Sequence, residues 1–313
     1  METSVRILKI LLESDASISG ERLAGSLSLS RTAVWKGVAK LKAEGVAIEA
    51  IQGVGYRLRG QAHALGPSLI SAALTTERLG RPVYYFPQTD STNLRAKELA
   101  GQGAPSGTLV IADFQTAGRG RLDRAWLSPP RTNLLFSLIL RPNLEVRGFS
   151  RLTMAAAVSL AEAVEGVTGL SPGVKWPNDL LVKEAKLAGI LTEISGQAQA
   201  LDWAVVGVGL NVGDRPPQEP AVCLAEAIGG PVDRLVLLDA FLNKLERLLA
   251  EGLPAEAIQE LWRRRSVTLG RVVTVMDGQT KVRGRALDID EDGALLVETP
   301  GGVRRIICGD VHL

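Results

Sequence analysis

The spacing of apolar residues changes type twice along the chain, and this change constrains the fold more than any single motif. Residues 1–60 have helical spacing that ends in a short alternating hairpin. Residues 69–265 mix strand-like runs with a few helices, and residues 267–313 contain only short strands. A chain of 313 residues with 46% hydrophobic residues is long enough for two or three separate cores. We therefore expect three domains with these bounds.

The first segment predicts three helices followed by a β-hairpin. Val5, Leu8 and Leu11 share one helical face, and Ser30 is a suitable N-cap for a third helix that ends near Gly45. The alternating run at 46–51, a glycine turn and residues 56–58 then predict the hairpin. Three helices and a β-wing in this order are typical of a winged helix-turn-helix domain.

The charge of this segment indicates DNA as a partner. Residues 31–60 contain six cations and two anions, an excess of the kind that phosphate contacts need. We predict that Arg31, Lys36 and Lys40 bind DNA and that Trp35 packs between helices. A protein-interaction module with a solvated basic face is the alternative. Residues 61–68 are the expected linker.

The central segment predicts a mixed α+β sheet. Its strand-like runs are residues 83–86, 108–112, 134–140, 174–178, 180–182, 186–194 and 203–211, and the last four of these form a meander. Its helices are expected at residues 93–100, 149–164, 233–250 and 254–264. Because strands and helices do not strictly alternate, a doubly wound sheet is not expected.

The loop after strand 108–112 combines residue types that suit an anionic ligand with a planar part. Its distinctive residues are Gly118, Arg119, Gly120, Arg121, Arg124 and Trp126. The glycines allow unusual backbone conformations and close approach, the arginines are permanent cations, and the indole offers a stacking face. The loop follows neither the Walker pattern nor the dinucleotide Gly-x-Gly-x-x-Gly pattern. A nucleotide fits, although an ordinary solvated loop fits equally well.

Further polar groups lie at strand ends. Ser91 either caps a helix, which is the commoner role, or joins its neighbours Thr92 and Asn93 in a site. Asn178 and Asp179 follow a proline at a turn, and Asn211 ends a glycine-containing strand. Lys186 opens an apolar run, so it points either to solvent or into a pocket, and its neighbours do not decide which.

Several classes of protein are excluded by what the sequence lacks. No apolar run approaches the ~18 residues of a membrane span, and the amino terminus has no signal-peptide pattern, so we expect a cytoplasmic protein. Cys223, Cys308, His63 and His312 are too few for a structural zinc site or a Ser/His device. We expect inert or buried thiols and no metal bound by the protein alone.

The last segment predicts a small closed β-barrel. Four short strands are expected at residues 272–275, 283–287, 295–298 and 304–308. Hairpin turns are indicated by the pairs Asp277-Gly278, Asp292-Gly293 and Gly301-Gly302.

The spaced motifs together resemble those of the biotin protein ligases. Residues 118–121 with Trp126, then 175–179, 186–190 and 207–211, occur in the order that this family has. With the winged helix in front, the chain is similar to the bifunctional type that also represses the biotin operon. This resemblance implies a class II synthetase-like catalytic domain and an SH3-like C-terminal domain.

The resemblance also implies the reaction and its partners. Biotin and Mg-ATP would give biotinyl-5′-AMP, and a lysine of a biotin carboxyl carrier protein would then take the biotinyl group. Operator DNA would be a second partner, and a homodimer is possible through an exposed sheet edge.

Site residues follow from the same resemblance. Those implied for biotin are Ser91, Thr92, Asn93, Gln115, Arg119, Gly120, Arg121, Lys186 and Gly189. Those implied for ATP are Gly118, Arg124, Trp126, Asn178 and Asn211. Lys186, Arg121 and Arg119 would serve catalysis, and Asp179 is a candidate to orient or deprotonate the acceptor lysine. Leu122-Asp123-Arg124 replaces the family's frequent Arg-Gly-Arg, so Asp123 reduces the loop's positive charge.

Two alternatives remain at this point. One is a ligase for another acyl acid such as lipoate, because that family shares a related fold. The other is a ligand-sensing transcriptional regulator without ligase activity. The presence of both Lys186 and the loop at 118–121 favours an enzyme.

Overall fold

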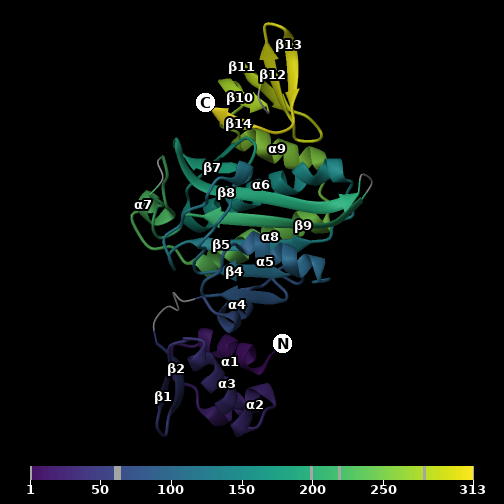
Figure 1. The fold of residues 1–313 in the computed structure, drawn as a ribbon. Coiled ribbons are helices and arrows are strands. Elements are labelled where there is room, and N and C mark those ends of the chain that lie inside the picture. Colours follow the sequence, from purple (N-terminus) through teal and green to yellow (C-terminus); the bar gives the residue numbers. More distant parts are fainter. Residues whose placement is uncertain (1, 60–64, 198–199, 218–219, 278–279, 313) are drawn as a thin grey trace.

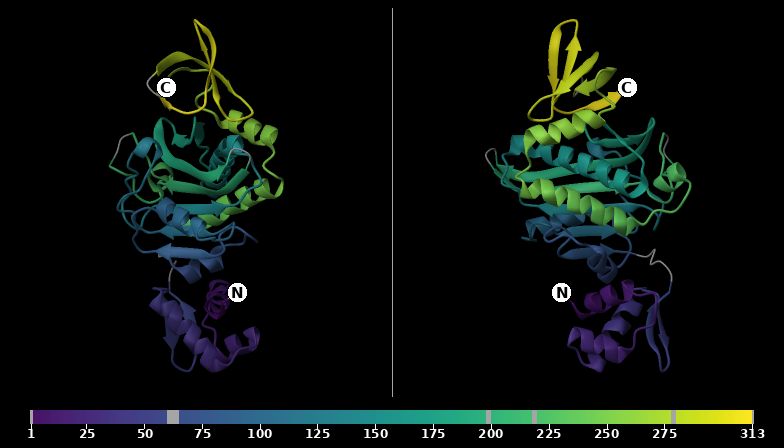
Figure 2. Two further views of the ribbon diagram at one scale, coloured as in Figure 1. Left: turned by 45° about the vertical axis from the view of Figure 1, so that its right-hand side comes forward. Right: turned by 180° about the vertical axis from the view of Figure 1, so that it is seen from behind.

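The structure is a computed structural model, and it describes residues 2–59, 65–197, 200–217, 220–277 and 280–312. Figure 1 shows three units in a row: a helical unit at the N-terminus, a large sheet with helices, and a small antiparallel unit at the C-terminus. The views in Figure 2 show the same order. This architecture confirms the predicted α+β fold class. Within the described chain, no helix combines the length and apolarity that crossing a membrane requires.

The N-terminal unit is the predicted winged helix-turn-helix. It consists of α1 (Thr3–Leu12), α2 (Gly20–Leu27), α3 (Arg31–Ala43), β1 (Ile48–Ile51) and β2 (Gly55–Leu58). The Ser30 hydroxyl accepts a hydrogen bond of 3.1 Å from the Ala33 amide, so the predicted cap does begin α3. β1 and β2 pair antiparallel as the wing.

The expected packing of Trp35 between helices is wrong. Val34, Val38 and Leu41 are the residues of α3 that turn inward, and all three are buried. Position 35 lies on the opposite side of the helix, where the indole is 62% exposed. The helical period of 3.6 residues places position 35 on the outward side of α3. The prediction relied instead on the apolar character of tryptophan.

The expected linker is partly helical. Residues 60–64 lie outside the described chain, whereas Pro67 and Ser68 begin α4 (Pro67–Ala73). The Ser68 hydroxyl lies 3.2 Å from that of Ser4 in α1, and its amide donates to a Glu44 carboxylate oxygen at 3.0 Å. α4 therefore packs against the N-terminal unit.

The central unit is a seven-stranded mixed sheet of strand order β3-β4-β5-β9-β8-β7-β6. Its strands are β3 (Val83–Phe86), β4 (Leu109–Ala112), β5 (Leu134–Leu140), β6 (Gly173–Lys175), β7 (Asp179–Val182), β8 (Ala185–Gln197) and β9 (Ala200–Leu210). Only β3 and β4 are parallel neighbours. The predicted meander at 174–211 is present, but its first strand ends at Lys175 because the Trp176 amide donates to Thr268 instead of a strand partner.

The two faces of this sheet are covered unequally. The helices are α5 (Thr92–Gly101), α6 (Phe149–Thr168), α7 (Leu224–Ile228), α8 (Arg234–Ala250) and α9 (Ala255–Arg265). The rear view in Figure 2 shows long helices across one face, where Leu109, Ile111 and Phe136 join the main core. On the other face Val110 and Val205 pack with α5 in a much smaller cluster. Part of this second face is therefore available for a ligand.

The C-terminal unit is a five-stranded antiparallel sheet of order β13-β12-β11-β10-β14. Its strands are β10 (Val272–Asp277), β11 (Thr280–Ile289), β12 (Leu295–Thr299), β13 (Gly302–Ile306) and β14 (Asp310–His312). The prediction missed β14, a three-residue strand without an alternating pattern. Gly278 of one predicted turn lies outside the described residues.

Candidate active site

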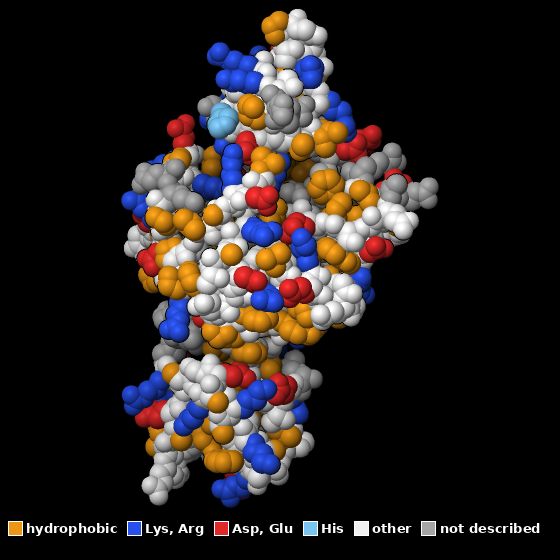
Figure 3. All heavy atoms as spheres, viewed as in Figure 1, with side chains coloured by type: hydrophobic (Ala, Val, Ile, Leu, Met, Phe, Trp, Pro, Cys, Tyr) orange, Lys and Arg blue, Asp and Glu red, His pale blue; other side chains and the backbone are white. Residues whose placement is uncertain are grey.

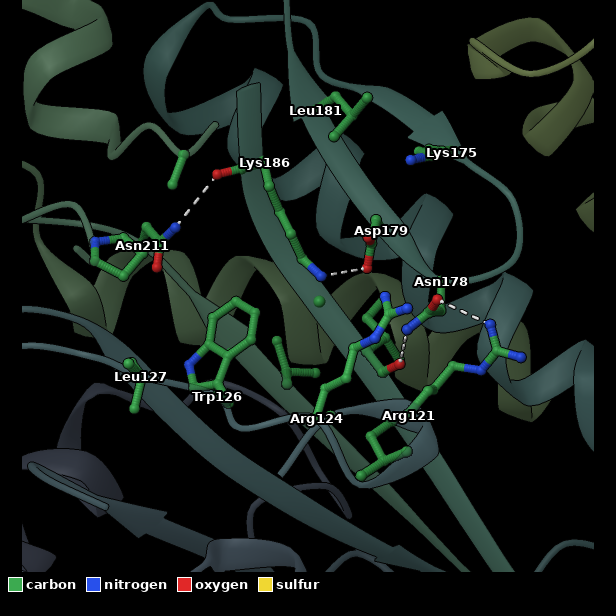
Figure 4. Close-up of a pocket in the computed structure, with 18 of the residues that line it drawn as sticks. Arg121, Arg124, Trp126, Leu127, Lys175, Asn178, Asp179, Leu181, Lys186 and Asn211 are labelled. Carbon is green, nitrogen blue, oxygen red and sulfur yellow. Dashed lines mark hydrogen bonds and ion pairs between the residues drawn. The ribbon is translucent and has the colours of Figure 1, made fainter. Parts of the chain in front are cut away.

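A cavity of about 830 Å³ lies over the sheet face that α5 leaves partly uncovered. Its walls come from the loop at 119–127, strands β7 to β9, and β14 of the C-terminal unit. Figure 4 shows Lys186, Asp179, Trp126, Asn211 and Arg121 around this space. The cavity thus joins segments that are far apart in sequence.

Of the two loop glycines, Gly118 acts by close packing, and neither has an unusual backbone conformation. Neither Gly118 nor Gly120 has a positive φ, contrary to the expectation from sequence. A Cβ at Gly118 would lie 2.5 Å from the carbonyl oxygen of Trp126, so only glycine allows this close approach. The left-handed conformations fall instead on Leu122 (φ 53°) and Asp123 (φ 55°).

Lys186 points into the cavity, which the sequence had left undecided. Its backbone pairs with Pro220 and Val222, and its side chain reaches across β8 toward β7. The ammonium nitrogen lies 2.8 Å from Asp179 Oδ1 in an ion pair that lacks hydrogen-bond geometry at the oxygen. It also lies 5.5 Å from the centre of a Trp126 ring. The cation is therefore held in one place within the cavity.

Trp126 sits on a gap made by two glycines. Gly189 of β8 is the cross-strand partner of Gly209 of β9. A Cβ at either position would come within 2.9 Å or 2.4 Å of the indole. The indole nitrogen is buried and has no hydrogen-bond partner in the described chain. One ring face is consequently fixed against the sheet.

Arg121 and Arg124 connect the loop to the C-terminal unit. Arg121 donates to the Gly309 carbonyl oxygen at 3.1 Å and to Asn178 Oδ1 at 3.4 Å. Arg124 forms an ion pair with Asp310. Burial lowers the pKa of Arg121, and Asp310 opposes this effect. The small β unit therefore completes the wall of the cavity.

Gln115 is held by the start of α5. Its side-chain oxygen accepts from the Thr92 amide at 2.7 Å and from the Thr92 hydroxyl at 3.0 Å. Its amide N–H groups are left to donate to a ligand. Ser91 is the N-cap residue of α5, but its side chain makes no capping hydrogen bond. Both residues line the cavity.

Two of the predicted biotin residues contribute less directly. Asn93 lines the cavity, but its amide is occupied: Oδ1 accepts from Ser137 at 2.6 Å, and Nδ2 donates to Glu193 at 2.9 Å. Gly207 leaves the space that this amide fills. Arg119 is exposed and has no ion-pair partner in the part of the chain that the structure describes.

The two asparagines fix neighbouring strands. Asn178 Nδ2 donates to the Ile190 carbonyl oxygen at 2.7 Å. Asn211 Nδ2 donates to the carbonyl oxygens of Lys186 at 3.3 Å and Val222 at 3.2 Å. Asn211 Oδ1 is buried and accepts no hydrogen bond from any described residue. It is thus an acceptor that a ligand N–H group would satisfy.

Sequence reasoning gave no role to several residues of this cavity, among them Lys175, Asp310 and His312. Lys175 belonged to a motif that had been recognised, but no role was assigned to it. Asp310 and His312 lie more than a hundred residues from the loop and carried no signal at all. The burial of Lys175 lowers its pKa, with Asp179 opposing and Lys186 reinforcing the change.

The cysteines do not form a site. Cys223 is buried, whereas Cys308 is exposed, so burial of the thiol is confirmed for Cys223 and inertness of Cys308 stays a prediction. Among the described residues, no group of three His, Cys, Asp or Glu side chains is placed to hold a metal ion. His63 lies outside the described chain.

A second charged surface lies on α3, at the opposite end of the molecule from the small β unit. Arg31, Lys36 and Lys40 are all exposed, and Figure 3 shows cationic side chains on this N-terminal unit. Lys40 forms ion pairs with Glu2 and, at 3.8 Å, with Glu44. Arg31 and Lys36 have no ion-pair partner among the described residues.

The wing carries less free charge than its composition indicated. Glu49 accepts from Arg59 at 2.7 Å and from Arg57 at 2.9 Å. These hydrogen bonds lower the pKa of Glu49 to about 2. Together with Lys40, three of the six cations counted in this segment are therefore already paired.

Comparison with known proteins agrees with this arrangement. Residues 85–211 match the Biotin/lipoate A/B protein ligase family, residues 5–57 an HTH domain, and residues 268–313 the Biotin protein ligase C terminal domain. The chain is 36% identical over 304 residues to the bifunctional ligase/repressor BirA of Bacillus subtilis, covering 95% of this chain and 94% of that protein. The BirA of Escherichia coli is 32% identical, with 94% and 92% covered.

A solved structure shares the same fold. The biotin protein ligase from Aquifex aeolicus, in complex with biotin and ATP, has a TM-score of 0.61 and 30% identity. The match covers 74% of this chain and 97% of that one. The sheet, the cavity and the winged helix thus define a protein ligase joined to a DNA-binding domain. The chain belongs to the biotin protein ligase family, in its bifunctional ligase/repressor form.

Proposed function

We propose that this protein activates biotin with ATP as biotinyl-5′-AMP and transfers it to a lysine of a biotin carboxyl carrier protein. The observation that carries this proposal is the Lys186 ammonium, held between Asp179 at 2.8 Å and the Trp126 ring at 5.5 Å, in a cavity that the arginine loop borders. Family membership supports the same activity.

The first step needs cations more than a general base. An ionised carboxylate must approach the α-phosphate, so two anions have to be brought together. Lys186 and Arg121 are placed to neutralise them, with Arg119 joining once a ligand is bound. Biotin's carboxylate is already ionised at neutral pH, so no proton has to be removed.

The proposed roles of the remaining residues follow from the hydrogen-bonding groups and ring faces that have no partner within the described chain. Gln115 offers amide donors and Ser91 a hydroxyl for the ureido end of biotin, beside Thr92 and Asn93. Trp126 offers its free ring face and Asn211 its unsatisfied Oδ1 to the adenine side, where Asn178, Gly118 and Arg124 support the wall. Gly120 and Gly189 leave space for the ligand.

Asp179 is the candidate for the transfer step. The acceptor lysine, with a pKa near ~10.4, must attack as a neutral amine. Asp179 would orient this amine or accept its proton, in addition to holding Lys186. If Asp179→Asn transfers biotin from preformed adenylate at the normal rate, this role is excluded.

Mg²⁺ would enter the cavity with ATP. Asp179 and Asp310 are hard oxygen ligands of the type that Mg²⁺ accepts, and it usually keeps waters and substrate phosphates as its other ligands. These residues fit a metal carried by the nucleotide. When bound, Mg²⁺ neutralises phosphate charge.

The second function is biotin-responsive repression through the winged helix. Arg31, Lys36 and Lys40 would contact operator phosphates from α3. We place the domain divisions near residues 60–69 and 265–267, as the change in pattern indicates. A homodimer and a cytoplasmic location complete the proposal.

The deciding experiment incubates the full chain with ATP, biotin and a carrier domain, and then probes for protein-bound biotin. We expect labelling that Lys186→Ala abolishes or greatly slows. Undiminished labelling by the variant would refute the site assignment.

Changes in the acyl substrate separate the alternatives. Without biotin, a ligase should release no pyrophosphate. Labelling with lipoate in its place would indicate the lipoate-type ligase, and binding of biotin without pyrophosphate release would indicate a pure sensor.

A further inference from the structure

The cations around the cavity differ in how they are held. They are Arg119, Arg121, Arg124, Lys175, Lys183, Lys186 and Arg271. Lys186 and Arg124 are in ion pairs, and Arg121 is hydrogen-bonded to Asn178 and Gly309. Of the others, Arg119, Lys183 and Arg271 are exposed. Lys175 alone in this set is partly buried and has no hydrogen bond or ion pair to any described residue.

The sheet places Lys175 beside the reacting centre. It ends β6 and is the direct cross-strand partner of Asp179 in β7, so the two side chains share a face. Asp179 is nevertheless turned toward Lys186, which comes from β8 on its other side. Figure 4 shows Lys175 apart from this ion pair. Two ammonium groups therefore flank one carboxylate that neutralises only one of them.

A partly desolvated cation without a partner is unfavourable unless a ligand supplies the opposite charge. The lowered pKa of Lys175, caused mainly by burial, agrees with an unmet demand for an anion. Burial also makes a contact with an anion stronger than it would be at the surface. Lys175 is therefore positioned to bind a second negatively charged group of the ligand, separate from the anionic group that Lys186 would contact.

We propose that Lys175 binds the β- and γ-phosphates of ATP and stabilises the leaving pyrophosphate. This inference rests on the proposed adenylation. A carboxylate oxygen of biotin forms a bond to the α-phosphorus, while the bond from that phosphorus to the bridging oxygen breaks and its electron pair leaves with pyrophosphate. No proton is transferred. Attacking and leaving oxygens lie roughly in line, so cations on opposite sides of Asp179 suit the two ends of this displacement.

The test separates the two half-reactions of the full chain with Lys175→Met. The first assay is biotin-dependent exchange of labelled pyrophosphate into ATP, and the second is transfer from preformed biotinyl-5′-AMP to a carrier domain. We expect exchange to fall on the order of 10²–10³-fold, as for other lost transition-state contacts, with the KM for pyrophosphate raised. Transfer from preformed adenylate should be unchanged, which also shows that the variant is folded.

Two matched variants sharpen the result. Lys175→Arg keeps the charge and should restore part of the exchange. Lys281→Met removes an exposed lysine of β11 that does not line the cavity, and it should leave exchange intact. Normal exchange by Lys175→Met, or an equal loss in both assays, would overturn the role of Lys175. An absence of exchange in the unmodified protein would instead refute the proposed ligase activity.

Discussion

The cavity and α3 both present cations that we propose bind an anionic partner, but the two surfaces hold these cations differently. In the cavity, Lys186 lies 2.8 Å from Asp179, and Arg121 is fixed by hydrogen bonds of 3.1 and 3.4 Å. On α3, Arg31 and Lys36 are exposed and unpaired within the described chain. The same residue types therefore serve as fixed, partly desolvated charges in one place and as solvated charges in the other.

This difference in how the cations are held indicates which kind of ligand each surface can bind selectively. Charges with one geometry and little water around them distinguish a small ligand by the position of its oxygens, and salt screens them weakly. Solvated charges on a helix contact any row of phosphates, and their effect falls with ionic strength. We therefore expect sequence specificity on α3 to come from other groups, such as the exposed Trp35.

The largest effect is expected where a cation is most buried. Arg234 is 7% exposed, donates to Asp113 at 2.9 Å and to the Asn133 carbonyl oxygen at 3.2 Å, and so ties together both stems of the arginine loop. Arg234→Met should lower the free energy of unfolding by about 3–5 kcal/mol, because it leaves the buried Asp113 carboxylate without its ion-pair partner. Denaturant unfolding of the full chain measures this loss.

The control for this prediction is an exposed pair. Arg264 lies 2.9 Å from Glu260 on α9 at the surface, so Arg264→Met should cost below about 1 kcal/mol. Similar losses in the two variants would contradict the contrast between buried and solvated cations.

A slightly smaller effect is expected in the cavity. Arg121→Met should slow adenylate formation on the order of 10²–10³-fold, because a fixed contact with developing charge is lost. Biotin-dependent pyrophosphate exchange measures this rate. Arg119→Met should lose less, since Arg119 is exposed and unanchored in the described chain. An equal loss of rate in the two variants would show that the hydrogen bonds holding Arg121 do not determine its contribution to catalysis.

A weaker effect is expected on α3. Lys36→Ala should reduce the slope of log K against log salt by about 1, because one phosphate contact disappears. Trp35→Ala should weaken binding to a preferred duplex without changing this slope, since the indole is uncharged. Fluorescence anisotropy at several salt concentrations separates the two. A change of slope with Trp35→Ala would contradict the expected charge-independent contact of the indole.

The smallest effect concerns the wing. The pKa of Glu49 is lowered to about 2, mainly by hydrogen bonds from Arg59 and Arg57. Its stabilising contribution is therefore complete above its ordinary pKa and is lost as pH falls toward 2. The difference in melting temperature between the protein and Glu49→Gln should shrink between about pH 4.5 and 2. A difference that stays constant over this range would contradict the ion pairs.

Local chemistry made most of the elements predictable. The cap at Ser30, the wing hairpin and the meander at 174–211 follow from residue spacing and turn chemistry, which act over a few neighbours. The short strand at 310–312 and the helix starting at Pro67 were missed, because their conformations depend on partners elsewhere in the chain.

The sequence by itself determined the order of the elements, the residue types of the arginine loop and the motifs that identify the family. Only the tertiary structure decided that Lys186 turns inward, that Trp35 turns outward, and that Asp310 reaches Arg124 from the far end of the chain. The physical reason is range: spacing sets backbone conformation locally, whereas the surroundings of a side chain depend on which distant segments pack beside it.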